Sequence, residues 1–278
     1  MTIAITGASG ALGQLALAAL KTRAPKADVI ALVRDPAKIS GTPARAFDYT
    51  KPATLAPALA GVDTLVLISS NDFNDRIGQH RAVIDAAKAA GVKRIIYTSI
   101  LKGDASPMIL AQDHIATEAA LHAAGIPATI LRNGWYTENY TGSLKPSVEH
   151  GALIGASGAG RIASAARADY AEAIAVTALD DAHAGKTYEL AGDIPHTMAD
   201  FAAEVSRQVG KTIPYNSLPK DTYAGILQSF GLPEGFATIL ADSDDTAARG
   251  SLLDESRTLS KLIGRPTTPI ADTIKSAL

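Results

Sequence analysis

Short apolar runs, rich in isoleucine, valine and leucine, alternate along the first half of the chain with longer alanine-rich stretches. Such runs are typical of strands buried on both faces of a parallel sheet, and the longer stretches are typical of the helices that connect them. We expect strands over 3–5, 29–33, 44–47, 64–69, 94–98 and 127–131, and helices over 11–22, 54–60, 79–90 and 111–124. Because parallel strands need right-handed crossovers, the pattern predicts a doubly wound α/β sheet, the Rossmann fold.

The pattern loses its regularity after residue 131. Residues 135–147 carry polar and aromatic side chains and 151–160 hold four glycines, so both stretches are predicted to be loops over the sheet. Residues 187–191 predict a further strand, and Thr197 with Asp200 three positions later predicts a helix N-terminus. We expect a Rossmann domain over 1–131 and 160–195, and a smaller, mostly helical substrate domain over 132–159 and 196–278.

The composition argues against several classes of function. The formal net charge of -2 leaves no basic excess for nucleic acid or an anionic membrane surface. The chain has no cysteine, which excludes disulfides and thiolate nucleophiles, and its six histidines are scattered, so we expect no metal. Charges interrupt every apolar stretch before it could span a bilayer, and no signal peptide precedes the first strand. We therefore expect a cytoplasmic protein.

Three glycines with the spacing GxxGxxG lie between the first predicted strand and the first predicted helix. A dinucleotide pyrophosphate binds backbone N–H groups at a helix N-terminus, where side chains would block its approach, and the third glycine lets helix and strand pack closely. The competing interpretation is a tight turn in an α/β domain without a ligand. The motif predicts a cofactor site formed by Gly7, Ala8, Ser9, Gly10, Ala11, Leu12 and Gly13.

Arg34 directly follows the strand at 29–33. NAD-specific Rossmann domains carry an acidic residue at this place, which accepts hydrogen bonds from the ribose hydroxyls. A guanidinium can instead hold a 2′-phosphate through paired, charge-assisted hydrogen bonds, which favours NADPH. NADH stays open, because Asp35 could turn inward to the ribose while Arg34 lies across the adenine. A solvent-facing Arg–Asp pair in a turn is the remaining interpretation.

Segments spread in order over nearly the whole chain resemble the NmrA-like branch of the atypical short-chain dehydrogenase/reductase superfamily. They read AITGASGALG, ALVRDPAK, LVLISS, AAKAAGVKRIIYTS, LRNGWYTENY, SAARADY, YELAG, LADSDD and LSKLIGRPTT. Within that branch the chain is most similar to the bacterial type 2 NAD(P)H:quinone oxidoreductases, and triphenylmethane reductases look similar too. The resemblance implies a reductase that uses NADPH, without flavin or metal, on a small-molecule quinone, and it leaves a homodimer open.

The usual catalytic pair of short-chain reductases is absent. None of the eight tyrosines has a lysine four residues later, so no phenol is activated in the usual way to protonate a carbonyl oxygen. Hydride transfer from the nicotinamide itself remains, with the protein orienting the substrate and stabilising the developing charge. A quinone suits such a site, because the hydroquinone anion is far less basic than an alkoxide.

Four residues at the predicted carboxyl edge of the sheet are candidate hydrogen-bond or proton donors. Ser99 is expected just after the strand at 94–98, Asn133 and Tyr136 just after the strand at 127–131, and His114 on the helix between them. Three of them have a structural alternative. Ser99 could be a turn cap, Tyr136 could pack between domains, and His114 could be a structural helix residue.

The resemblance also implies cofactor contacts from residues beyond the glycine loop. These are Asp48, Ser69, Ser70, Glu138, Asn139, Tyr140 and Arg167. Asp48 could instead be an ordinary turn aspartate. Arg167 could pair with Asp169, which is expected to be the N-cap of the following helix.

The leading hypothesis is an NADPH-dependent, flavin-independent quinone reductase. One alternative is an NmrA-like redox sensor that binds NADP without turning it over and passes its state to a partner protein. Another keeps the enzyme but changes the substrate to a conjugated, dye-like molecule. The LRNGWYTENY block matches the enzymes of the branch and argues against the sensor.

Overall fold

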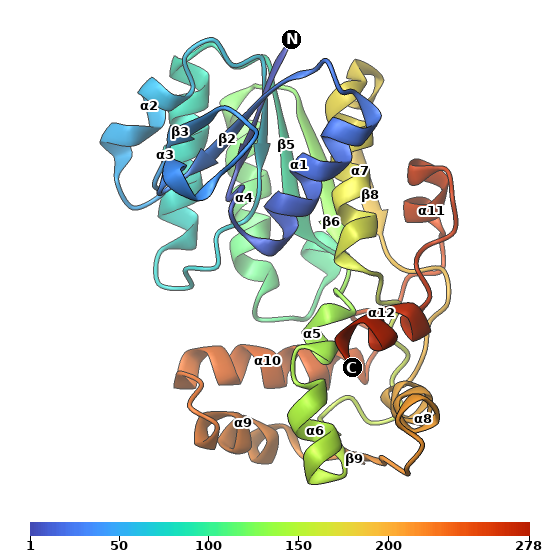
Figure 1. The fold of residues 1–278 in the computed structure, drawn as a ribbon. Helices are drawn as coiled ribbons and strands as arrows, with labels where there is room; N and C mark the ends of the chain where they lie inside the picture. Colours follow the sequence, from blue (N-terminus) through green and yellow to red (C-terminus); the bar gives the residue numbers. More distant parts are fainter. The chain divides into compact units, whose positions relative to one another are not determined.

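The computed structural model describes residues 1–278 and is built around one seven-stranded sheet (Figure 1). Its strands are β1 (Thr2–Thr6), β2 (Asp28–Val33), β3 (Ala44–Ala46), β4 (Thr64–Leu67), β5 (Arg94–Ile100), β6 (Ala128–Asn133) and β8 (Thr187–Leu190). They lie in the order β3-β2-β1-β4-β5-β6-β8, and β1 pairs in parallel with both β2 and β4. The predicted doubly wound Rossmann fold is confirmed, and its topological switch point lies between β1 and β4.

The chain divides into two compact units. Unit 1 comprises Met1–Gly103, Asp113–Asn133 and Arg167–Tyr188, and unit 2 comprises Asp104–Gln112, Gly134–Ala166 and Glu189–Leu278. The assignment of a substrate-binding role to the second part of the chain stays a prediction.

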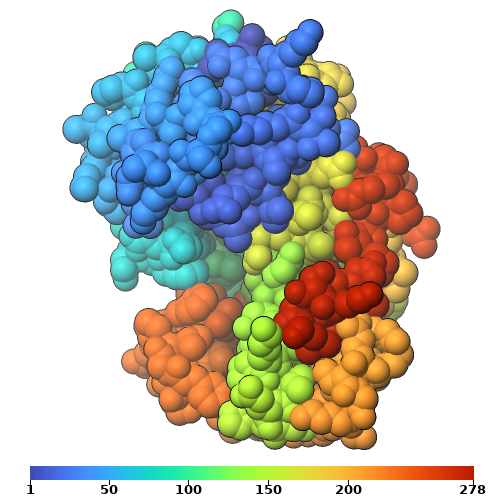
Figure 2. All heavy atoms as spheres, in the orientation of Figure 1, coloured from blue at the N-terminus to red at the C-terminus, as the bar shows by residue number.

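Helices cover both faces of the unit 1 sheet. They are α1 (Ala11–Arg23), α2 (Leu55–Ala58), α3 (Arg76–Ala89), α4 (Ala111–Ala124) and α7 (Arg167–Leu179), with 3₁₀ turns at Pro36–Lys38, Pro52–Thr54, Gly103–Ala105 and Asp181–His183. α1 and α7 pack side by side, in dark blue and yellow in Figure 2. Buried alanines on both helices allow this close approach. α2, α3 and α4 pack with the strands in a second apolar layer that includes Leu65, Val83 and Leu121.

Unit 2 is mostly helical. Its elements are α5 (Glu138–Thr141), α6 (Leu144–His150), β7 (Leu153–Gly155), α8 (Met198–Val209), β9 (Tyr215–Ser217), α9 (Lys220–Ser229), α10 (Glu234–Ala247), α11 (Thr258–Ile263) and α12 (Ile270–Ala277). The capping box predicted at the start of α8 is confirmed: Thr197 Oγ1 accepts from the Asp200 N–H at 3.1 Å, and the Asp200 carboxylate accepts from the Thr197 N–H at 2.9 Å.

The prediction of loops over 135–147 and 151–160 is wrong. The first stretch contains α5 and begins α6, and the second contains β7, which pairs in parallel with β9. Both helices are short and polar, so they have no apolar period. β7 is a three-residue strand whose partner lies about 60 positions later in the chain (Leu153 opposite Tyr215), and local patterning carries no signal for such a pair.

Several predicted boundaries also move. Ser99 lies inside β5, and Asn133 is the last residue of β6. Both strands run two residues further than predicted, because they continue to pair there: Ser99 lies opposite Arg132 and Ile100 opposite Asn133. Asp169 is not an N-cap but a buried residue within the first turn of α7. The helix predicted over 54–60 consists of a 3₁₀ turn and one α-helical turn.

The helix predicted over 79–90 begins earlier, at Arg76. The Asp75 carboxylate caps it by accepting from the Gly78 N–H at 3.2 Å. The longer helix places Arg76 and His80 one turn apart on the same face.

Candidate active site

The glycine loop joins β1 to α1 at the switch point of the unit 1 sheet. Gly7 has a positive φ of 58°, its carbonyl accepts from the Gly10 N–H at 2.9 Å, and Gly10 begins α1 without a side-chain cap. The first turn of α1 has no acidic residue, and Ser9, Gly10 and Ala11 are exposed. The positive end of the helix dipole is therefore open to an anion.

The second and third glycines cannot carry side chains without disturbing the backbone. A Cβ at Gly10 would lie 3.2 Å from the Gly7 carbonyl oxygen. A Cβ at Gly13 would overlap the same carbonyl and lie 2.7 Å from the Ala8 Cα. The loop is thus a cradle of backbone groups with the shape that a pyrophosphate needs, and the residues present fit a dinucleotide.

Arg34 is exposed directly after β2, as predicted from the sequence. The neighbouring Asp35 carboxylate accepts from the Ala37 N–H at 3.1 Å and so caps the 3₁₀ turn at Pro36–Lys38. Asp35 is therefore engaged as a cap, and Arg34 is the charged side chain left at the end of β2.

Asp48 follows β3 in a compact turn. Its carboxylate accepts from the Thr50 N–H at 3.0 Å and the Thr50 hydroxyl at 2.8 Å, and Lys51 lies 3.5 Å away. Burial opposes ionisation of Asp48, but these hydrogen bonds outweigh it and lower its pKa. This geometry is that of an ordinary turn aspartate. A cofactor contact by Asp48 stays a prediction.

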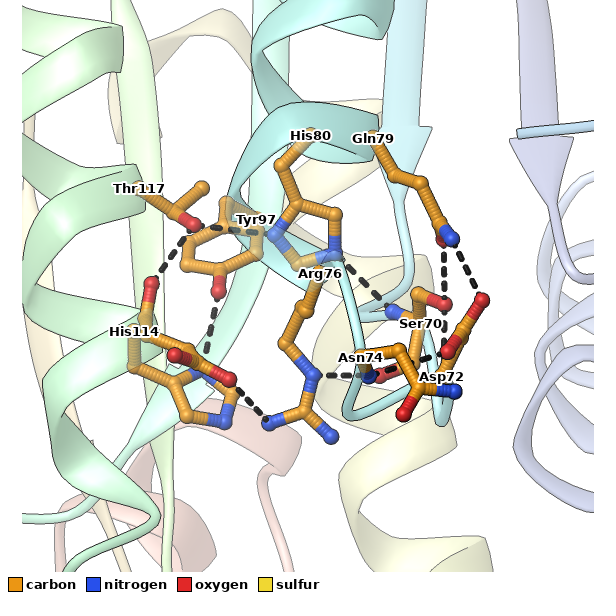
Figure 3. A network of polar contacts seen from close by, with 10 residues as sticks. Ser70, Asp72, Asn74, Arg76, Gln79, His80, Tyr97, His114 and Thr117 are labelled. Carbon is orange, nitrogen blue, oxygen red and sulfur yellow. Dashed lines mark hydrogen bonds and ion pairs between the residues drawn. The ribbon is translucent and has the colours of Figure 1, made fainter. Parts of the chain in front are cut away.

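Ser69 and Ser70 follow β4, beside the glycine loop. A Cβ at Gly7 would lie 3.8 Å from the Ile68 side chain, so the loops after β1 and β4 are in contact range. The Ser69 N–H donates to Thr98 Oγ1 at 2.9 Å, whereas Ser70 belongs to a dense polar network (Figure 3). The structure thus brings the two serines and the glycine loop together within unit 1.

That network connects α3, β5 and α4, and the sequence did not reveal it. His80 Nε2 accepts from the Ser70 N–H and His80 Nδ1 lies 2.9 Å from Thr117 Oγ1, while the Tyr97 hydroxyl lies 2.8 Å from His114 Nδ1 (Figure 3). Burial, reinforced by the charge of Arg76, lowers the pKa of His80 to about 3. Arg76 and His80 are polar residues four positions apart, which would indicate a shared helix face. This signal could be used only if α3 were known to begin at Arg76.

His114 is buried, and burial lowers its pKa well below the ordinary value, with further contributions from the charges of Arg76 and His80. Burial also raises the pKa of Tyr97. At neutral pH His114 is therefore a neutral ring hydrogen-bonded to a neutral phenol, and it cannot give up a proton as an imidazolium.

Ser99 is hydrogen-bonded to a partly buried ion pair. Its hydroxyl donates to Glu118 Oε1 at 2.5 Å, and Arg132 donates to both Glu118 oxygens, at 3.0 and 2.7 Å. The bidentate pair fixes the Glu118 carboxylate, which in turn fixes the Ser99 hydroxyl. This geometry does not favour Ser99 as a donor to substrate.

The remaining candidates are divided between the units. Asn133, at the carboxyl end of β6, and Arg167, at the start of α7, belong to unit 1. Unit 2 contains Tyr136, which bridges to Ala165, and the α5 residues Glu138, Asn139 and Tyr140. The roles of all six stay predictions.

Unit 2 also contains a buried carboxyl that the sequence prediction left unassigned. Asp244 on α10 accepts from the Ala156 N–H at 2.9 Å, and a Cβ at Gly155 would lie 2.5 Å from Asp244 Oδ2. The phenols of Tyr140, Tyr215 and Tyr223 interact electrostatically with it. Burial raises the pKa of Asp244 to about 6, against the lowering effect of its hydrogen bonds.

No three or more histidine, aspartate or glutamate side chains are grouped so that they could hold a metal ion. No helix combines the length and the apolar character needed to cross a bilayer.

Comparisons with known proteins agree with this geometry. The family model described as the NmrA-like family matches residues 1–262. Quinone oxidoreductase 2 of Escherichia coli is 50% identical over 277 residues, which are 98% of this chain and 97% of that protein.

Solved structures give the same result. The crystal structure of the NADPH-dependent quinone oxidoreductase of Escherichia coli complexed with NADPH has a TM-score of 0.95 and 50% identity, with 99% of each chain covered. The triphenylmethane reductase of Citrobacter sp. complexed with NADP(H) has a TM-score of 0.94 and 37% identity, with 100% of each chain covered. The chain belongs to the NmrA-like family and is a full-length homologue of quinone oxidoreductase 2.

Proposed function

We propose that this chain reduces quinones by direct hydride transfer from NADPH, without flavin. The observation that carries the proposal is the open backbone cradle at Gly10 and Gly13, followed at the end of β2 by the exposed Arg34. The relative with 50% identity is named as a quinone oxidoreductase, and its crystal structure is described as NADPH-dependent and complexed with NADPH.

The chain's own residues have separate tasks in this proposal. The N-terminus of α1 binds the pyrophosphate, and Arg34 binds the 2′-phosphate. The bound nicotinamide supplies the hydride. We assign the hydrogen bonds to the quinone to Asn133 and Tyr136. The Ser99 hydroxyl already donates to Glu118, and His114 Nδ1 is hydrogen-bonded to the Tyr97 hydroxyl. The hydroquinone anion that forms is weakly basic, so no strongly activated acid is needed.

The test mixes purified protein with NADPH and a small benzoquinone, without added flavin, and follows the absorbance of NADPH. We expect oxidation of NADPH well above the uncatalysed rate. Tight NADPH binding with no oxidation would indicate the redox sensor instead. A parallel reaction with a triphenylmethane dye tests the second candidate substrate, which the 37% identity to the Citrobacter sp. enzyme favours. Faster reduction of the dye than of the quinone would replace the substrate in our proposal.

Cofactor choice is tested at Arg34. Replacing it with alanine should weaken NADPH binding by about 1 to 3 kcal/mol and barely change NADH binding, because only NADPH carries the 2′-phosphate. The matched control is Arg34→Lys, which keeps the charge but loses the forked donors and should weaken NADPH less. Titrations in which alanine affects both cofactors equally would show that Arg34 does not recognise the phosphate.

A further inference from the structure

Asp244 lies where several elements of unit 2 meet. It belongs to α10, and its Oδ2 accepts from the Ala156 N–H at 2.9 Å, in the turn after β7. The phenols that interact with its carboxyl come from α5, β9 and α9 and are those of Tyr140, Tyr215 and Tyr223. The carboxyl is buried among them. One side chain of α10 is thus in a position to connect four other parts of unit 2.

The charged neighbours of Asp244 on its own helix have other partners. Asp242 pairs with Lys220 at 3.5 Å, and Asp245 pairs with Arg249 at 2.7 Å. The titratable groups that face Asp244 are the three phenols, and burial raises the pKa of each, so they are neutral at physiological pH. Phenol hydroxyls, rather than cations, are therefore the side-chain donors around this carboxyl.

The phenols are not equivalent. The Tyr215 hydroxyl accepts from the Ser157 N–H at 3.0 Å and shares a second hydrogen bond with Ser157 Oγ at 2.9 Å. The Tyr140 hydroxyl interacts with Asp244, but it is buried and makes no hydrogen bond of standard geometry. Buried donors without a partner are rare and call for an explanation. Tyr140 is thus an unused donor beside a buried carboxyl.

Tyr140 also determines how α5 is held. α5 is a single turn of four residues, and the centre of the Tyr140 ring lies 5.8 Å from that of Phe201 on α8. Glu138 and Asn139, two of the predicted cofactor contacts, belong to the same turn. A change at the Tyr140 hydroxyl therefore acts on the whole of this short helix.

We propose that Asp244 is a positioning residue for α5 and acts through Tyr140 as an acid-sensitive latch. The ionised carboxylate accepts the hydrogen of the Tyr140 hydroxyl and holds α5 to α10. Uptake of one proton by the carboxylate removes the charge that strengthens this hydrogen bond, so α5 loosens while the contact to the Ala156 N–H remains. The latch itself is independent of the proposed function, and only its effect on NADPH rests on that function.

Burial sets the pH at which the latch responds. It raises the pKa of Asp244 to about 6, whereas the hydrogen bonds from the Ala156 N–H and the Tyr140 hydroxyl lower this pKa. The carboxyl is therefore mostly ionised at pH 7.5 and mostly protonated at pH 5. The latch is closed in the first condition and open in the second.

The first test measures the pKa of Asp244 by carbon-13 NMR of its carboxyl group. Tyr140→Phe keeps the ring against Phe201 but removes the hydroxyl, so the pKa should rise by about 1 or more. Tyr223→Phe is the matched control, because Tyr223 interacts with Asp244 without a hydrogen bond, and it should change the pKa by less than about 0.5. The same pKa in Tyr140→Phe and in the parent would overturn the proposal.

The second test compares amide hydrogen exchange of α5 in the parent and in Asp244→Asn. Asparagine keeps an acceptor for the Ala156 N–H but cannot ionise. At pH 7.5 the α5 amides should exchange about 3- to 10-fold faster in the variant, and at pH 5 the two rates should agree within about twofold. Intrinsic exchange rates cancel in this ratio. A ratio that is the same at both pH values would mean that Asp244 is merely structural.

The third test carries the latch to the proposed cofactor site. The dissociation constant for NADPH in Asp244→Asn, divided by that of the parent, should fall from about 3- to 10-fold at pH 7.5 to within about twofold at pH 5. The 2′-phosphate titrates in the same range, but it does so with both proteins and cancels in the ratio. A constant ratio would overturn the link between latch and cofactor. A parent protein that does not bind NADPH would refute the proposed function, and the first two tests would still decide the latch.

Discussion

Each unit of the molecule contains a buried cluster of ionisable groups, and burial acts on the two clusters in opposite directions. In unit 1 the imidazoles of His80 and His114 are buried, and the pKa of His80 falls to about 3. In unit 2 the carboxyl of Asp244 is buried, and its pKa rises to about 6. The physical cause is the same, because burial favours whichever form of a group is neutral.

The two clusters therefore respond oppositely to pH. Below about pH 6.5 the unfolded chain protonates His80 while the folded protein does not, so folding stability is lost as the pH falls toward 3. Asp244 stays protonated in the folded protein up to about pH 6, whereas the unfolded carboxyl ionises near 3.8. Its stabilising contribution is lost as the pH rises from about 4 to 6, and it is constant above that range.

The largest expected effect on folding stability comes from replacing one glycine in each unit with alanine. Gly13→Ala would drive a Cβ into the backbone of Gly7 and Ala8, which cannot move without opening the loop. Gly155→Ala would meet the side chains of Asp244 and Tyr215, which can shift. In urea denaturation we expect Gly13→Ala to lower the free energy of unfolding by about 3 kcal/mol or more, and Gly155→Ala by about 1 to 2 kcal/mol.

Gly225→Ala is the control for this pair. Gly225 lies in α9, its φ is not positive, and a Cβ there would have nothing within 4 Å. Alanine should stabilise the helix by about 0.5 to 1 kcal/mol. A loss at Gly155 as large as at Gly13 would mean that the Asp244 cluster is as rigid as the backbone.

The second prediction isolates the carboxyl of unit 2. Asparagine at position 244 keeps an acceptor for the Ala156 N–H but cannot ionise. Because the pKa of Asp244 rises from 3.8 to about 6, the stability of Asp244→Asn relative to the parent should increase by about 3 kcal/mol between pH 4 and pH 7. A difference that does not change with pH would show that Asp244 titrates alike in the folded and unfolded chain.

The third prediction isolates an imidazole of unit 1. Between about pH 6 and pH 4 the parent takes up one proton on His80 when it unfolds, and His80→Gln cannot. The free energy of unfolding of the variant should therefore fall less steeply as the pH is lowered, and the two slopes should differ by about 1.4 kcal/mol per pH unit. The measurement is a series of urea midpoints across this range for both proteins. Parallel curves would mean that His80 is already charged in the folded protein.

Most of the fold could be predicted from local patterning. Most strands of unit 1 contain an apolar run, and glycines follow α3 and α4, so periodicity and turn residues predicted most of these elements. β7 and its partner β9 were missed because a three-residue strand is stabilised by pairing with a distant segment. α5 and α6 were missed because neither has an apolar stripe.

The candidate site also has a part that local sequence patterns predict and a part that they do not. Gly7, Gly10, Gly13 and Arg34 could be predicted as phosphate-site residues because a phosphate needs specific residues at fixed positions after a strand, and their role stays a prediction. The hydrogen bonds of Ser70 were not found, since they depend on where α3 begins, and that boundary is set by the Asp75 cap. A sequence motif thus predicts candidate ligand-binding residues, whereas hydrogen bonds that depend on a helix boundary leave no local signal.

The smallest expected effect comes from the neighbour of Asp244 on α10. Asp245 forms an ion pair with Arg249 at 2.7 Å, one helical turn later, and both side chains are accessible to solvent. Water screens such a pair and side-chain entropy opposes it, so Asp245→Ala should cost less than about 0.5 kcal/mol, with an effect that shrinks as salt is added. Removing the carboxyl one residue earlier, by Asp244→Asn, should instead have a strongly pH-dependent effect. If Asp245→Ala matched Asp244→Asn in its pH response, the contrast between the two clusters could not be attributed to burial.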